Sequence, residues 1–138
     1  MQLPSLFDGK IQTRYKRFLA DVVLDDGRLV TAHCPNTGSM RGCWEPDARV
    51  QLSHSDNPRR KLAWTLERVD MGQGWIGVHT GRTNPVVEEA VRAGAIASLQ
   101  GYESVQREVT YAPGGDKRAR FDLYLSQGQT ADAWVEVK

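Results

Sequence analysis

Two short segments near the end of the sequence, Arg120-Phe121-Asp122-Leu123-Tyr124-Leu125 and Trp134-Val135-Glu136-Val137-Lys138, decide how the second half of the chain folds. Both alternate polar and apolar residues, which is the pattern of a half-buried strand. A short polar turn separates them, so we expect the two strands to pair as a hairpin. In that hairpin Asp122 lies on the polar face of the first strand, and Glu136 and Lys138 lie on the polar face of the second. The alternation therefore predicts two carboxylates and an ammonium group on one side of a small sheet.

This group of side chains has the chemistry of a metal-nuclease site. Mg²⁺ prefers carboxylate oxygens together with waters and substrate phosphate, and Asp122 and Glu136 would supply the protein's ligands. Lys138 would steer or deprotonate the attacking water, or neutralise charge on a phosphate. Without metal, repulsion between the carboxylates should raise the pKa of one of them. The same spacing also fits an ordinary solvent-facing sheet with a cross-strand ion pair, because it arises often by chance.

Length and composition indicate an ordinary globular protein. The 138 residues suffice for one domain or two small ones, and 40% are hydrophobic and 25% charged. The net charge is only +1, so any affinity for nucleic acid must come from local basic patches. Cys34 and Cys43 lack the spacing of a zinc site and are too few for a disulfide framework, which predicts reduced thiols. With no signal-like or long apolar segment at its start, the chain is expected to be cytoplasmic, with no membrane partner.

The first 80 residues have the pattern of an all-β domain. The expected strands cover residues 18–24, 29–33, 49–54, 61–69 and 75–80. Asp25-Asp26-Gly27 is a strong hairpin signal between the first two, and Met71-Gly72-Gln73-Gly74 turns between the last two. Five short strands with glycine-rich turns predict a small barrel of the oligonucleotide/oligosaccharide-binding (OB) type.

A second domain, residues 81–138, is expected where the hydrophobic period changes. Thr83-Asn84-Pro85 is a helix start, because a polar cap candidate precedes a proline at the first helical position. The expected apolar stripe is Val86, Val87, Ala90, Val91 and Gly94, with Glu88 and Arg92 pointing away from it and Glu89 on its border. A strand at residues 105–111 and a turn at residues 113–116 lead into the final two strands. This half of the chain therefore predicts an α/β core.

Longer blocks of the sequence carry a resemblance to a known family. The blocks are RYKRFLADV (14–22), HCPNTGSM (33–40), Arg60-Lys61 with Trp64-Thr65, and VEVK (135–138). Together they closely resemble the sugar fermentation stimulation protein A family, over essentially the whole chain. The order of acidic residues, Glu89 on a helix and then Asp122 and Glu136-x-Lys138 on strands, resembles the PD-(D/E)xK nuclease superfamily. Ala119 departs from the serine usual before Arg120-Phe121-Asp122.

The resemblance implies an α+β protein, in which a five-stranded OB-fold-like barrel precedes an α/β PD-(D/E)xK restriction-endonuclease-like core. By position, the catalytic residues would be Glu89, Asp122, Glu136 and Lys138, with Asp122 and Glu136 holding Mg²⁺ or Mn²⁺. It also implies DNA, or RNA, as the partner. Because the sequence stops at Lys138, we expect the nuclease-like core to continue in a longer protein. A homodimer is left open.

Two basic clusters in the barrel half would suit a nucleic-acid partner. Their residues are Arg14, Tyr15, Lys16 and Arg17 in the first, and Arg59, Arg60 and Lys61 in the second. Clustered cations with a nearby aromatic are typical of barrels that bind single strands, since cations contact phosphates and rings stack on bases. The alternative is a charged strand edge that blocks aggregation. His33 and Asn36 are more often structural than functional in such a loop, and the tryptophans, Trp44 excepted, are expected in the core or barrel wall.

Two functions of different classes follow. The first is a metal-dependent nuclease, in which the barrel binds the strand and the acidic residues hold the metal. The second is a non-cleaving DNA-binding regulator on a nuclease-derived scaffold, linked by the family's name to sugar fermentation. A barrel that binds a sugar or small metabolite is a weaker third reading.

Overall fold

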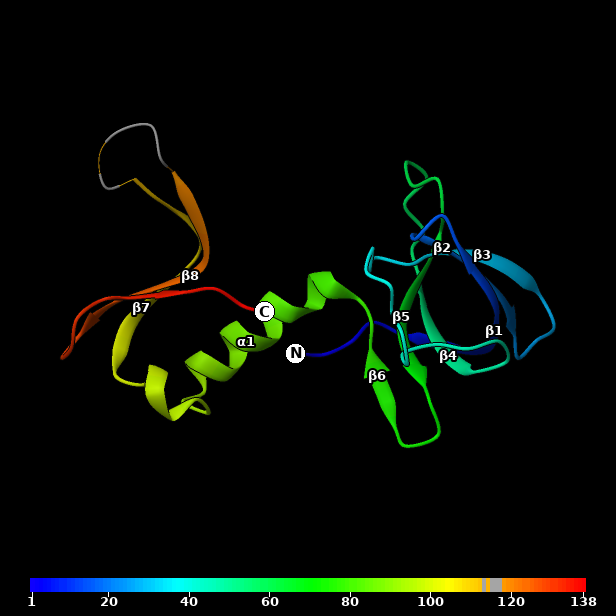
Figure 1. Cartoon of the computed structure of the whole chain (residues 1–138), viewed down its shortest axis with the longest axis horizontal. Helices are drawn as coiled ribbons and strands as arrows, with labels where there is room; N and C mark the ends of the chain where they lie inside the picture. The colour runs from blue at the N-terminus through cyan, green and yellow to red at the C-terminus, as the bar shows by residue number, and fades with distance from the viewer. Residues whose placement is uncertain (113, 115–117) are drawn as a thin grey trace. The chain divides into compact units, whose positions relative to one another are not determined.

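The computed structural model describes residues 1–112, 114 and 118–138, which form two compact units (Figure 1). Gln2–Gly81 make one unit, and Arg82–Lys138 together with Met1 make the other. Apart from Gly114, the turn expected at residues 113–116 lies outside the described residues.

The first unit is a closed barrel. Its strands are β1 (Leu6–Tyr15), β2 (Leu19–Leu24), β3 (Leu29–His33), β4 (Arg49–His54), β5 (Trp64–Asp70) and β6 (Trp75–Gly77). The sheet order is β3-β2-β1-β4-β5-β6, and a parallel pairing of β3 with β5 closes β1 to β5 into a five-stranded barrel. The core consists of inward residues with no exposed surface, among them Ile11, Val22, Val50, Leu52 and Leu66. The predicted OB-like barrel is therefore confirmed.

The set of five strands nevertheless differs from the one expected. β1 was not predicted, and the segment expected as the fifth strand forms the short β6, which pairs with β5 outside the closed ring. The reason is Gly9, which occupies an inward position of β1 and leaves Ile11 as that strand's one fully buried side chain. A Cβ at Gly9 would lie 2.6 Å from the Val23 carbonyl oxygen, so close packing of backbone replaces the apolar alternation that marks a strand.

The second unit is smaller and contains one helix and a three-stranded antiparallel sheet. Its elements are the 3₁₀ turn η1 (Thr80–Arg82), which begins in the barrel unit, helix α1 (Thr83–Arg92), the 3₁₀ turn η2 (Ala97–Leu99), and strands β7 (Tyr102–Tyr111), β8 (Ala119–Gly128) and β9 (Ala133–Val135), in sheet order β7-β8-β9. Val91 of the helix and Leu123 and Leu125 of β8 form its buried core. No described helix is long and apolar enough to cross a membrane.

The buried face of the helix overlaps the expected apolar stripe but is rotated from it. Val86 is 47% exposed, whereas Val87 and Val91 pack in the core cluster. Positions 84, 87, 88 and 91 share one face at helical spacing. Glu88 therefore turns toward the protein and not away from it, and it pairs with Arg92 at 2.9 Å and with Arg107 of β7 at 3.3 Å.

Candidate active site and nucleic-acid interface

Asp122 lies in β8, and its carboxylate is held from two sides. The Asn84 side-chain amide donates to Oδ1 at 2.7 Å, and the Val137 backbone N–H donates to Oδ2 at 2.8 Å. The Asp122 side chain is half-buried, although strand alternation placed it on the polar face of the sheet. It is half-buried because the first turn of α1 and the segment after β9 both reach it. Asp122 is thus fixed in one orientation by groups from two separate parts of the chain.

The same two hydrogen bonds determine how Asp122 titrates. The Val137 N–H, and after it the Asn84 amide, lower the pKa of Asp122 below its ordinary value of 3.8, because both donors favour the charged carboxylate. The direction is opposite to the upward shift that repulsion from a second carboxylate would cause. The carboxylate is ionised at neutral pH, as a metal ligand must be.

Glu136 and Lys138 follow the short strand β9 and do not continue it. β8 and β9 pair Leu123 with Val135, and extending that register by one residue sets Glu136 opposite Asp122. Lys138 Nζ lies 3.5 Å from Glu136 Oε1, and the two side chains are 80% and 55% exposed. The Val137 N–H, bonded to Asp122, ties this segment to β8. The structure thus brings three of the four predicted catalytic residues into one region.

Glu89, the fourth, is placed differently. Its side chain is 58% exposed and pairs with the amino group of Met1. It follows Asn84 by five residues, which rotates it about 140° around the helix from the side chain that touches Asp122. The helix residue in contact with Asp122 is therefore Asn84, which sequence reasoning treated as a capping candidate. The helix start also differs from the one expected: α1 begins at Thr83 with Arg82 at the N-cap and no side-chain cap hydrogen bond, so Asn84 lies inside the first turn and Pro85 is not the first helical residue.

A ready-made multidentate metal cluster is absent from the described part of the chain. Over residues 1–112, 114 and 118–138, no group of three or more His, Cys, Asp or Glu side chains converges closely enough to hold a metal ion. The available donors are the two carboxylates of Asp122 and Glu136.

The first basic cluster lies at the β1–β2 turn. Lys16 and Arg17 are exposed and have left-handed backbone φ angles of 49° and 66°. Tyr15 donates to Asp21 at 3.2 Å. Arg14 donates to the carbonyls of Arg17, Asn36 and Gly38 at 2.6–2.9 Å, so its guanidinium organises the following loop. Lys16 and Arg17 are the members of this cluster that face solvent.

The second basic cluster lies in the loop between β4 and β5, residues 55–63. Arg59, Arg60 and Lys61 are exposed, and Arg60 donates to Thr65 at 2.7 Å. A shallow hollow of about 230 Å³ is lined by His33, Arg60, Lys61 and Leu62. His33, which the sequence favours as a structural residue, lies beside Thr65 and next to this loop through the β3–β5 pairing.

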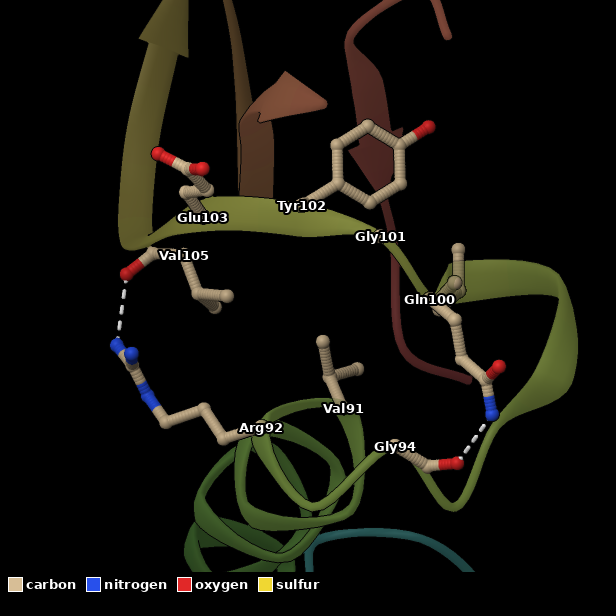
Figure 2. A pocket seen from close by; sticks show the side chains of 9 residues that line it. Val91, Arg92, Gly94, Gln100, Gly101, Tyr102, Glu103 and Val105 are labelled. Atoms are coloured by element: carbon tan, nitrogen blue, oxygen red, sulfur yellow. Dashed lines mark hydrogen bonds between the residues drawn. The ribbon is translucent and has the colours of Figure 1, made fainter. Parts of the chain in front are cut away.

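A separate hollow of about 290 Å³ lies between the end of α1 and the start of β7 (Figure 2). Figure 2 shows Arg92 reaching the Val105 carbonyl, a bond of 2.7 Å, and Gln100 reaching the Gly94 carbonyl at 2.5 Å. None of the predicted site residues lines it. Its polar groups hold η2 and β7 against the helix.

The fold and the site together define a class, an OB-type barrel followed by a mixed helix-and-sheet unit that carries Asp122 on its sheet. Residues 13–78 match the family described as "SfsA N-terminal OB domain", and residues 81–138 match "Sugar fermentation stimulation protein RE domain". The chain belongs to the sugar fermentation stimulation protein family, so the recognition made from the sequence blocks is confirmed.

Relatives named sugar fermentation stimulation protein homolog align with nearly the whole chain. The protein of Geobacter metallireducens is 51% identical and covers 100% of this chain and 58% of its own length, and that of Alkalilimnicola ehrlichii is 53% identical and covers 94% and 55%. A solved structure, Pyrococcus furiosus SfsA in complex with Ca²⁺, has a TM-score of 0.77 at 20% identity and covers 99% of this chain and 55% of that one. The chain thus spans a little over half the length of these relatives.

Proposed function

We propose that this chain carries the metal-binding part of a nucleic-acid phosphodiesterase, with Asp122 and Glu136 as ligands for Mg²⁺ or Mn²⁺ and the barrel as the nucleic-acid-binding module. The observation that carries the proposal is the fixation of an ionised Asp122 by Asn84 and by the Val137 N–H. A carboxylate on a plain polar sheet face needs no such fixation, whereas a metal ligand needs a fixed orientation.

The donor set fits a hard cation. Each oxygen of Asp122 accepts one hydrogen bond and keeps further acceptor capacity, since an ionised carboxylate has about four lone-pair sites. Glu136 is exposed and is paired only loosely with Lys138, at 3.5 Å. Two carboxylates suffice for Mg²⁺, which usually keeps several waters and binds substrate phosphate. The Ca²⁺ named for the similarly folded Pyrococcus protein supports an oxygen-ligated cation in this family.

Each residue then has a role. A bound cation would stabilise the charge on a phosphodiester. Lys138 would neutralise charge on the phosphate or orient the attacking water. Asn84 would hold Asp122 in its binding orientation. Glu89, on the exposed side of the helix, would act only through waters or through chain beyond the described residues.

The barrel supports the binding half of the proposal. OB folds bind oligonucleotides with the face of strands 2 and 3 and with the loops between strands 1 and 2 and between strands 4 and 5. In this chain those two loops carry the exposed cations Lys16 and Arg17, and Arg59, Arg60 and Lys61. The overall charge of +1 provides no general positive field, so these loops would provide the phosphate contacts.

A second function is a DNA-binding regulator of sugar fermentation that does not cleave. The observation in its favour is that Glu136 and Lys138 are exposed and lie outside a strand, so that only Asp122 of the site is rigidly held. Either function would place the protein in the cytoplasm, where its nucleic-acid partner is.

Cleavage of single-stranded and duplex DNA and RNA by the complete protein with Mg²⁺, with Mn²⁺ and with chelator separates the two functions. Asp122→Asn is the informative variant, because it removes the charge and keeps an acceptor for the Val137 N–H. We expect Asp122→Asn and Lys138→Ala to abolish cleavage and leave binding unchanged, with the exposed turn carboxylate variant Asp25→Asn as the matched control. Binding without cleavage in every metal would refute the nuclease and support the regulator.

A second set of variants tests the barrel. Changing Arg59, Arg60 and Lys61 together to Ala should weaken binding. It should also reduce the slope of log K against log salt concentration by the contribution of up to about three phosphate contacts. An unchanged salt slope would show that the phosphates lie elsewhere.

A further inference from the structure

Three aromatic rings gather at the base of the β4–β5 loop. His54 is the last residue of β4 and Trp64 the first of β5, and the two are paired across the sheet with ring centroids 4.6 Å apart. Phe7 of β1 packs edge-on to both rings, at 5.0 Å from Trp64 and 6.4 Å from His54. The three rings form an aromatic cluster, here called the aromatic shelf, whose ring planes are inclined to one another by 60–89°. It includes none of the predicted site residues.

The side chain of Arg28 packs against this shelf. The Arg28 guanidinium lies 5.6 Å from the centre of the Trp64 ring, and Arg28 is held by two contacts of 2.7 and 2.8 Å to Asp26 in the same hairpin turn. The Arg28 side chain is still 58% exposed. The guanidinium is therefore held over one face of the indole, while more than half of the Arg28 side chain remains exposed to a ligand.

The simplest structural reading is that the rings close one end of the barrel. Trp64 does pack against the barrel core, which agrees with the expectation from the sequence. If the rings only closed the barrel, Phe7 and His54 would be buried as well. Phe7 is instead 40% exposed and the His54 side chain 33%. Contiguous exposed aromatic surface of this kind is typical of a binding site.

The surroundings indicate what that partner is. The loop that leaves the shelf at His54 and returns at Trp64 carries Arg59, Arg60 and Lys61, all exposed. Aromatic rings next to a row of cations match a polyanion that carries flat bases along its charged backbone, which is a nucleic acid. A sugar would use the rings without needing the cations, and a duplex would use the cations without reaching the rings, because its bases are already stacked.

We propose that Phe7, His54 and Trp64 form a base-stacking platform, with Arg28 at its side, which makes the barrel a binder of single-stranded nucleic acid. This rests on the nucleic-acid-binding half of the proposed function and specifies its substrate form. The ligand strand would contact the β4–β5 loop through its phosphates and the shelf through one or two unpaired bases.

The test compares a labelled single-stranded oligonucleotide with a duplex of the same sequence, by fluorescence anisotropy over a series of salt concentrations. We expect Phe7→Ala and His54→Ala each to weaken single-strand binding about fivefold or more, because stacking contributes roughly that factor per base. The salt slope should stay unchanged, since no phosphate contact is removed. Trp75→Leu, in the β5–β6 hairpin at the other end of β5, is the aromatic control and should bind like the wild type.

A second measurement does not depend on truncating the core. Trp64→Phe keeps a ring at the position, and it should retain binding while losing the fluorescence quenching that base stacking causes. Equal affinity of Phe7→Ala and wild type, or equal losses for duplex and single strand, would overturn the platform while leaving the proposed function intact. Failure of the wild type to bind any nucleic acid would refute both.

Discussion

Asn84→Ala tests whether the amide contact to Asp122 holds the site together. Asn84 Nδ2 donates to Asp122 Oδ1 at 2.7 Å, and it is the helix group that ties α1 to the carboxylate. Alanine removes that donor and leaves Asp122 with the Val137 N–H alone. The variant should therefore loosen the carboxylate without emptying a hydrophobic position.

The size of the effect follows from the charge and the exposure of the pair. A hydrogen bond to a charged group contributes about 1.5–3 kcal/mol when buried. Asp122 is only half-buried, so solvent screening reduces the expected contribution to about 1 kcal/mol. Alanine gains about 0.5 kcal/mol of helix propensity over asparagine, which would hide part of the loss. Thr83→Ala, an exposed neighbour in the same turn, gives the control for that gain.

The loss also has a defined pH dependence. Because the folded-state pKa of Asp122 lies below its unfolded value of about 3.9, the contact stabilises the protein above that pH. The stabilisation disappears as the pH falls through the folded-state pKa. In Asn84→Ala the pKa of Asp122 should rise toward 3.8 and remain below it, since the Val137 hydrogen bond, the larger cause, persists.

The assay is a double-mutant cycle of Asn84→Ala and Asp122→Ala, with urea unfolding followed through the amide NMR signals of Leu123 and Leu125, which report on this unit alone. We expect a coupling free energy of about 1 kcal/mol at pH 7 and a smaller one as the pH falls through the folded-state pKa of Asp122. Zero coupling at pH 7, together with an unchanged Asp122 titration, would refute the reasoning.

The remaining predictions concern packing and one further ionisable group. Gly9→Ala should destabilise the barrel by about 1–3 kcal/mol in thermal unfolding, since its Cβ would meet the Val23 carbonyl oxygen at 2.6 Å, whereas Gly77→Ala, with open space around it, should have little effect. Leu125→Ala should cost about 2–5 kcal/mol and remove hydrogen-exchange protection from the small unit while the barrel keeps its own; full protection in both units would contradict the division into separate cores. Asp132→Asn should lower the pKa of Tyr124, which the hydrogen bond to Asp132 raises, and a spectrophotometric titration with no change would show that this bond does not form in solution.

Local signals predicted most of the barrel. The Asp25-Asp26-Gly27 turn fixed the hairpin, and the strand expected at residues 29–33 has the observed bounds. Strand β1 was not predicted because Gly9 occupies one of its inward positions. Gly9 contributes close backbone packing and no apolar side-chain area. The alternation of apolar and polar side chains cannot reveal an inward strand position that is occupied by glycine.

The contact of Asn84 with Asp122 was not predicted for a different reason. In the sequence it stands before Pro85, where a short polar residue ordinarily caps a helix, and this local reading was sufficient to explain it. Its actual partner is 38 residues away in the chain, on a strand. Asp122, by contrast, was found because strand alternation and family resemblance both pointed to it.

The contact between Asp122 and the Val137 N–H gives the acidic site a property that spacing could not reveal. Glu136 and Lys138 flank Val137, lie outside any strand and are largely exposed, so this one hydrogen bond ties the segment that carries them to β8. Asp122 thereby acts both as a candidate ligand and as the anchor of the other candidate ligand. Because a hydrogen bond to an ionised carboxylate is stronger than one to a neutral carboxyl group, the charge state that favours a cation also strengthens the tie to the segment that carries Glu136. Loss of the charge on Asp122 should therefore weaken cation binding at the proposed site and the tie to the Glu136 segment together.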